Sequence, residues 1–145
     1  MVTINYKILD ERVTAPSYAH AGDAGLDLRS TENLTIKPGQ RCIVSTGVSF
    51  EIPEGFAGLV IPRSGLAAKH GISIVNAPGL IDSGYRGEIK VILLNTSKDE
   101  AFEIQQNDRI AQIMFVPFCS VNLNLVDELS ESERNLGGFG SSGVK

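Results

Sequence analysis

Short runs in which apolar and polar residues alternate recur along most of this chain. Alternation with a period of two is typical of a half-buried β-strand, because successive side chains point to opposite faces of a sheet. Turn-forming sequences such as Pro38-Gly39 and Pro53-Glu54-Gly55 separate the runs. The runs cover residues 4–8, 34–36, 42–50, 56–61, 72–75, 89–94, 101–104 and 110–118. So many short strands predict a β-sandwich or a jelly roll.

One segment departs from the strand pattern. Residues 64–70 combine a candidate cap, Ser64, with small residues, and Gly71 follows them. Serine is a common residue just before a helix and glycine a common residue just after one. We therefore expect an all-β fold that contains one very short helix.

Composition limits what such a fold can do. With 145 residues and 42% hydrophobic content, the chain can close the core of one compact domain. Its 13 basic and 17 acidic residues give a formal charge of −4, so no chain-wide positive field exists to hold polymeric DNA or RNA. The longest strongly apolar run, residues 113–119, is far shorter than the roughly 20 residues that span a bilayer. We expect neither a nucleic-acid-binding protein nor a membrane protein.

The two cysteines bear on the cellular compartment. Cys42 and Cys119 lie in apolar contexts and lack the CxxC spacing of a metal or redox site. The first ten residues lack the basic start and apolar middle of an export signal. Both observations favour reduced core thiols in a cytoplasmic protein.

The C-terminal end has a different composition. Residues 127–133 are mostly acidic, and residues 134–145 contain four glycines and two serines. Such a sequence cannot bury enough apolar surface to order itself. We predict a domain over residues 1–127 and a flexible arm over 128–145. The arm is either a frayed terminus or a segment that a partner orders, and backbone N–H groups beside glycines suit phosphate oxygens.

Four clusters of polar residues interrupt the strand pattern, and the first two combine charge with glycine. The sequence AGDAGLDL at residues 21–28 places two carboxylates four residues apart. The sequence PRSGLA at residues 62–67 sets an arginine and a hydroxyl where a strand ends and the helix begins, and such groups suit phosphate. Taken alone, the first cluster can equally be a surface turn, and the second a helix cap with a solvated arginine.

The other two clusters place polar residues beside apolar strands. The sequence NAPGLIDSGYRG holds Asp82 directly after an apolar pair, with Tyr85 three residues later. In the sequence RIAQI, strand alternation sets Arg109 and Gln112 on opposite faces, and an amide in an apolar strand needs hydrogen-bond partners. A hairpin turn and an amide bonded to a neighbouring backbone are the ordinary alternatives.

The order of these clusters along the chain is far more specific than any one of them. Together with RNLGGFGSSG at residues 134–143, they resemble the five motifs of the trimeric deoxyuridine triphosphate nucleotidohydrolases, the dUTPases. The resemblance extends from about residue 7 to residue 143. It implies a distorted jelly-roll (β-clip) domain that assembles as a homotrimer with shared active sites. It also implies hydrolysis of dUTP to dUMP and pyrophosphate, by Mg²⁺-assisted attack of water on the α-phosphorus.

The resemblance further implies a role for each motif residue. Asp82 would be the general base, Asp27 would hold Mg²⁺ through coordinated water, and Tyr85 would pack on the deoxyribose. Asn76 and the backbone of Gly79 would pair with the uracil edge. The phosphate chain and the closing arm would use Arg63, Ser64 and Gly65 from the second motif, Gln112 from the fourth, and Arg134, Phe139, Gly140, Ser141, Ser142 and Gly143 from the fifth.

The arm sequence departs from the family pattern at one position. Asn135 follows Arg134, where the family often has glycine. Asparagine is among the non-glycine residues that best tolerate a positive φ, so the turn can be kept.

Three other functions fit parts of the sequence. A dCTP deaminase shares the implied fold, but Ile92 stands where that family has its catalytic glutamate. A non-catalytic nucleotide-binding or regulatory protein would be favoured by loss of Asp82 or of the arm, and both are present. A hydrolase with a Ser, His or Cys nucleophile is disfavoured, because His20 and His70 stand in no recognisable triad context.

Overall fold

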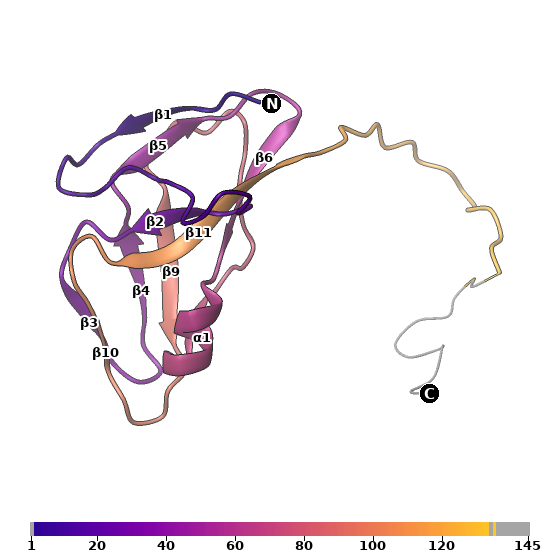
Figure 1. Ribbon diagram of the computed structural model, residues 1–145. Coiled ribbons are helices and arrows are strands. Elements are labelled where there is room, and N and C mark those ends of the chain that lie inside the picture. The colour runs from indigo at the N-terminus through magenta and orange to yellow at the C-terminus, as the bar shows by residue number, and fades with distance from the viewer. Residues whose placement is uncertain (1, 134, 136–145) are drawn as a thin grey trace.

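The computed structural model describes residues 2–133 and 135. In this part of the chain, eleven strands and one short helix form the fold (Figure 1). Their bounds are β1 Asn5–Ile8, β2 Leu26–Arg29, β3 Leu34–Ile36, β4 Arg41–Ser45, β5 Val48–Glu51, β6 Phe56–Ile61, α1 Ser64–His70, β7 Ile72–Ile74, β8 Gly79–Ile81, β9 Lys90–Asn95, β10 Phe102–Ile104 and β11 Arg109–Pro117.

The strands pair in four antiparallel sheets. The largest has the order β2-β11-β6-β8, and a second has the order β4-β9-β7. Two further pairs, β1 with β5 and β3 with β10, complete the arrangement. Strands that are neighbours in a sheet are mostly distant in sequence, as in a jelly roll. The predicted all-β fold with one very short helix is confirmed.

The sheets share one hydrophobic core. Val44 of β4, Leu93 of β9 and Ile113 of β11 have no exposed side-chain surface and belong to the same buried cluster. Alternation places them there, since every second residue of β9 faces inward. In β11 the alternation shifts at a β-bulge between Arg109 and Ala111. As a result, consecutive residues of β11 are buried at the bulge.

Three segments differ from the sequence prediction. The predicted strand over residues 42–50 is two strands, because the chain turns at Gly47 with a φ of 67°. Residues 26–29 and 79–81, which are not among the predicted strands, form β2 and β8. Both are edge strands of the largest sheet and pair on one side only. Glycine and aspartate are uncommon in strands, so the sequence of these two segments does not indicate strands. Pairing with the neighbouring strands imposes the extended conformation.

The short helix lies where it was predicted, but its cap is different. Arg63 is the residue before α1, and its side chain makes no capping hydrogen bond. Ser64, predicted as the cap, is the first helical residue. At the other end Gly71 adopts a left-handed conformation with a φ of 65°, and its N–H bonds back to the helix.

The cysteine prediction is wrong for one residue. Cys42 is half-buried, and burial raises the pKa of its thiol. Cys119 is exposed, because it follows β11 where the chain leaves the body of the fold (Figure 1). Neither is in a disulfide bond. No helix in the described part of the chain has the length and apolar character to cross a membrane.

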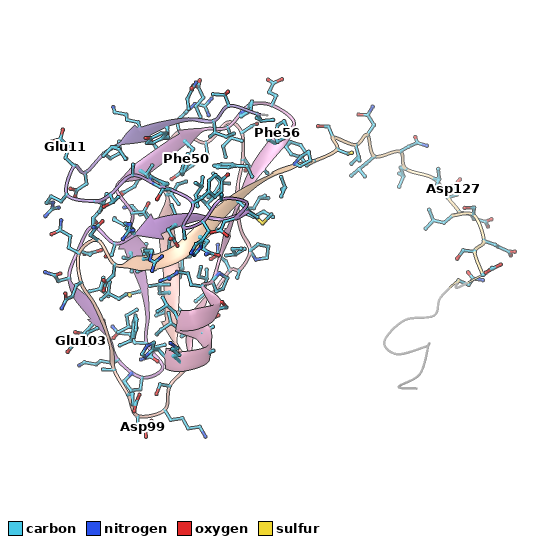
Figure 2. The ribbon with its side chains drawn as sticks, in the orientation of Figure 1. Glu11, Phe50, Phe56, Asp99, Glu103 and Asp127 are labelled. Atoms are coloured by element: carbon cyan, nitrogen blue, oxygen red, sulfur yellow. The ribbon has the colours of Figure 1, made fainter. Side chains whose placement is uncertain are left out.

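The segment after β11 extends away from the sheets. Figure 2 shows Asp127 on this segment, far from the body of the fold. Its apolar side chains lie open, and Leu123 and Leu125 are 95% and 98% exposed. Regular structure therefore ends at Pro117 among the described residues, while the predicted boundary at residue 127 stays a prediction.

Replacing Gly47 with alanine should destabilise the fold much more than the same change at Gly39. Both have a φ near 70°, but a Cβ on Gly47 would lie 2.9 Å from side-chain atoms of Asp10 and Thr31, while nothing lies within 4 Å at Gly39. We expect a loss of about 3 kcal/mol in the free energy of unfolding for Gly47→Ala, from strain plus overpacking, and about 1 kcal/mol for Gly39→Ala. Urea titrations at equal protein concentration measure both, and equal losses would contradict the packing argument.

Candidate functional site

Strand register brings three of the polar clusters together. Asp27 of β2 is paired with Gln112 of β11, and Gln112 is paired on its other side with Ile61 of β6. Arg63 follows β6 two residues later, at the start of α1. The first, second and fourth clusters therefore meet at one end of the largest sheet.

Asp27 is the buried charge of this site. The residue is only 5% exposed, and Nη1 of Arg109 donates a hydrogen bond to its Oδ2 over 3.2 Å. Its Oδ1 lies 3.7 Å from Nε of Arg63 and has no hydrogen-bond partner in the described part of the chain. One carboxylate oxygen is thus held, and the other is buried but free.

Arg63 is fixed on its other side. Its Nη1 donates a 2.7 Å hydrogen bond to the backbone carbonyl of Arg109. Burial, and then the positive charge of Arg109, lower the pKa of the Arg63 guanidinium. Ser64 and Gly65 follow it at the exposed start of α1. Two guanidinium groups, a hydroxyl and one carboxylate share a small region that suits an anion with several oxygens.

Gly25 lets Gln112 approach the first cluster. A Cβ on Gly25 would lie 3.2 Å from the Cβ of Gln112 and 3.3 Å from its Oε1, closer than ordinary contact. The glycine between the two carboxylates of AGDAGLDL therefore has a packing reason. The sequence interpretation gave no role to this glycine.

The third cluster forms a separate surface. Asp82 is exposed directly after β8, and its backbone carbonyl accepts a 3.1 Å hydrogen bond from the N–H of Tyr85. The Tyr85 hydroxyl donates to the carbonyl of Glu88 over 2.9 Å, which orients the ring. Asp82 and Tyr85 line a shallow cavity of about 280 Å³. Asn76 lies against the buried Gly79, since a Cβ there would be 3.4 Å from its Nδ2.

The loop that follows Asp82 is anchored to the body of the fold. Oε1 of Glu88 accepts a 2.9 Å hydrogen bond from the N–H of Gly47, and Thr46 donates to the carbonyl of Ile89 over 2.6 Å. These bonds tie the loop to the turn between β4 and β5. Asp82 and Tyr85 therefore lie on a supported loop.

Within one chain the two surfaces are far apart. β2 and β8 are the opposite edges of the sheet, and Ile81 is paired with Gly58, three residues before Ile61. Asp82 follows Ile81, so it lies three strands across and about four residues along from Asp27. Strand spacing and rise put the two carboxylates on the order of 20 Å apart. The third cluster does not complete the site of Asp27 in its own chain.

The remaining predicted residues belong to the arm. Arg134, Phe139, Gly140, Ser141, Ser142 and Gly143 lie outside the described residues. Asn135 is described and has a φ of 43°. The expectation that this asparagine can take the positive φ of a glycine is confirmed.

Arg109 is the site residue that sequence reasoning missed. Alternation predicted it on the face opposite Gln112. The β-bulge after Arg109 shifts the register by one, so Arg109 pairs with Arg29 while Gln112 pairs with Asp27. Both side chains therefore share the Asp27 face. A bulge leaves no clear mark in a single sequence, and no signal here could have revealed it.

The residues around Asp27 fit a metal whose other ligands are waters and substrate phosphates. Between residues 2 and 133, and at 135, no group of three or more His, Cys, Asp or Glu side chains could hold a metal ion. Mg²⁺ is commonly bound by one or two carboxylates, waters and substrate phosphates. The free Oδ1 of Asp27 can accept a hydrogen bond from a metal-bound water, and the guanidinium groups beside it suit phosphates.

Comparison with known proteins gives one consistent family. The dUTPase family model matches residues 11–143. A deoxyuridine 5'-triphosphate nucleotidohydrolase of Leifsonia xyli subsp. xyli is 51% identical over 97% of this chain and 91% of its own length. One from Clostridium acetobutylicum is 46% identical over 100% of this chain and 99% of its own.

Solved structures agree with the sequence comparison. The dUTPase of Staphylococcus bacteriophage 80alpha with dUpNHpp has a TM-score of 0.92 at 32% identity, and the match covers 99% of this chain and 100% of that one. A D95N mutant dUTPase from phage phi11 of S. aureus, described with a structural Mg(II) ion, has a TM-score of 0.83 at 26% identity over 90% of this chain and 100% of that one.

Removing the Asp27 carboxylate should destabilise the fold, because two guanidinium groups lose their counter-charge. Their side chains keep 24% and 42% exposure at Arg63 and Arg109, so we expect Asp27→Ala to cost about 2 kcal/mol, less than a fully buried pair. Arg12→Ala is the control: it breaks an ion pair with Asp10 of 2.6 Å whose arginine is 68% exposed, and it should change stability little. Urea denaturation compares them, and equal effects would contradict the role of burial.

Proposed function

This chain belongs to the dUTPase family and hydrolyses dUTP to dUMP and pyrophosphate, and we propose that it does so by attack of water on the α-phosphorus with Asp82 as general base. The main support for this role is the placement of Asp82, exposed beside a cavity and restrained by Tyr85. A carboxylate is sufficient because phosphoryl transfer depends mainly on positioning and charge stabilisation. The reaction removes dUTP from the DNA precursor pool.

The phosphate chain binds at the other surface. Arg63 offers a planar fork of donors whose position is fixed by the Arg109 carbonyl, and Ser64 and Gly65 add a hydroxyl and backbone N–H groups beside it. Gln112 adds an amide next to Asp27. These donors stabilise the charge that the equatorial oxygens share during the reaction.

Asp27 would hold a metal through water. Its free Oδ1 would accept a hydrogen bond from a metal-bound water, while its Oδ2 keeps the hydrogen bond from Arg109. When bound, Mg²⁺ neutralises phosphate charge and orients the phosphate oxygens. The guanidinium group of Arg63 then shares the same phosphates.

Base and sugar are selected at the third cluster. The Tyr85 ring, oriented by its bond to Glu88, packs on the deoxyribose and leaves no room for a 2′-hydroxyl. Asn76 and the backbone of β8 at Gly79 pair with the uracil edge. Cytosine presents the opposite polarity at N3 and C4 and would leave these groups unpaired, which discriminates strongly. A tight hairpin excludes the thymine methyl group by its shape.

The active site is shared between subunits of a homotrimer. A separation on the order of 20 Å between Asp27 and Asp82 in one chain is too long for one triphosphate site, so the two surfaces meet across an interface. Apolar side chains that lie open also favour assembly, including Ile43, which is 64% exposed on β4, and Leu123 and Leu125 after β11. The arm, with Arg134 and its glycines, comes from a third subunit and closes over bound nucleotide.

Two further assignments accompany this function. We infer a cytoplasmic location, because both cysteines are free. The deaminase alternative is disfavoured because Ile92 is a half-buried residue of β9, paired with Ile43, and offers no carboxylate for a proton shuttle.

Replacing Asp82 with asparagine should abolish most turnover while leaving the fold intact. Loss of a general base typically lowers a rate about 10²–10⁴-fold, and we expect a drop in this range in pyrophosphate release from dUTP with Mg²⁺. Asp99→Asn is the matched control, since Asp99 lies at the far tip of the turn after β9 (Figure 2). Full turnover by Asp82→Asn would contradict the general-base role. Release of ammonia from dCTP would instead support the deaminase alternative.

Two inactive variants should restore activity when their subunits mix. If Asp82 and Gln112 reach one site from different subunits, co-assembly of Asp82→Asn with Gln112→Ala should give about one quarter of wild-type turnover, because each site draws the two residues from independently chosen chains.

A second mixture is the control for that experiment. Arg63 and Gln112 lie at the same end of one sheet in one chain, so Arg63→Ala with Gln112→Ala should stay inactive. The shared-site proposal fails if the Asp82→Asn mixture is as inactive as its parents.

A further inference from the structure

Arg109 contacts both charged residues of the phosphate surface, yet the reaction described above gives it no task. We propose that Arg109 is a positioning residue that keeps Oδ1 of Asp27 free for a metal-bound water. This inference rests on the proposed role of Asp27. In this proposal, the guanidinium group of Arg109 determines which oxygen of the Asp27 carboxylate stays free.

The two oxygens of the Asp27 carboxylate have different contacts. Arg109 donates to Oδ2 over 3.2 Å, which is within hydrogen-bond distance. Arg63 approaches Oδ1 only to 3.7 Å, which is beyond it. The side chain of Asp27 is 7% exposed, so bulk water does not reach Oδ1 freely. Among the described residues, the hydrogen bond from Arg109 therefore distinguishes the bonded oxygen from the free one.

Without Arg109 the carboxylate has a competing partner. A small rotation about its terminal torsion would bring Oδ1 closer to Nε of Arg63, and the present 3.7 Å ion pair would become a direct hydrogen bond to the oxygen that is now free. That pair would occupy both the oxygen that the metal-bound water needs and a donor that the phosphate needs. Arg109 prevents this by satisfying Oδ2.

Arg109 also holds Arg63 through its backbone. The 2.7 Å hydrogen bond from Nη1 of Arg63 to the Arg109 carbonyl keeps that guanidinium away from the carboxylate. The two cations repel one another, and the charge of Arg109 is one cause of the lowered pKa of Arg63. The β-bulge after Arg109 is what places its side chain on the Asp27 face.

Calorimetric titration with dUpNHpp, in the presence and absence of Mg²⁺, tests the proposal without turnover. Wild-type protein should bind the analogue more tightly with Mg²⁺. In Arg109→Gln this gain should shrink by about 10–100-fold, as it does when partners of metal-binding groups are removed. Binding without Mg²⁺ should also weaken, because one guanidinium group beside the phosphates is lost, so the ratio of the two affinities is the readout. Arg109→Lys keeps the charge without the planar fork and should recover part of the gain. An undiminished gain in Arg109→Gln overturns the proposal.

The control and a structural measurement complete the test. Arg12→Gln removes a different arginine paired with an aspartate, on the exposed surface, and should leave the Mg²⁺ gain intact. A crystal structure of ligand-free Arg109→Gln should show Oδ1 of Asp27 within about 3 Å of Nε of Arg63. If that distance stays at its present 3.7 Å, the proposal is wrong. If wild-type protein shows no Mg²⁺ gain, the metal role of Asp27 fails, and the crystal structure alone decides whether Arg109 positions the carboxylate.

Discussion

The antiparallel register of β11 is the constraint on which the site depends. This central strand pairs with β2 on one side and β6 on the other, so it fixes where the first and second clusters stand relative to the fourth. A slip of one residue would send Gln112 to the opposite face and separate it from Asp27. The buried residues of β11 resist such a slip, because Ala111 and Ile113 would leave the core. Core packing and site geometry are therefore set by the same pairing.

The same sheet explains why one chain does not complete the site. Its two edge strands carry the two kinds of chemistry: β2 holds the carboxylate among the guanidinium groups, and β8 leads to Asp82. The edges of this open four-stranded sheet do not meet within the chain, but they can face the edges of other copies. The loop after β8 is anchored through Glu88 to the turn at Gly47, so it is presented outward as a supported surface. In the proposed trimer, assembly would bring together parts that folding keeps apart.

Sequence reasoning predicted features that depend on local pattern. Alternation and turn residues predicted most strands and the helix at residues 64–70, because side-chain period and glycine or proline conformation are local properties. It failed where pairing with other strands determines the local structure. β2 and β8 are strands because β11 and β6 pair with them, and Arg109 faces Asp27 because of a bulge. The order of strands in a sheet is not written in any short segment, so residue patterns alone did not indicate the separation of Asp27 from Asp82. Only the resemblance, which implied active sites shared between subunits, pointed to it.

The free oxygen of Asp27 shows how folding and catalysis compete at this site. A buried acceptor without a partner costs about 1–3 kcal/mol, and the simplest way to remove that cost is a closer ion pair with Arg63. That pair would stabilise the empty protein and weaken the site, since both groups would be occupied before substrate arrives. Holding Oδ2 with Arg109 and Arg63 with a backbone carbonyl blocks this alternative. Under the proposed metal role of Asp27, a hydrated metal that accompanies the nucleotide would satisfy this oxygen, and the cost in the empty protein would then favour the loaded state.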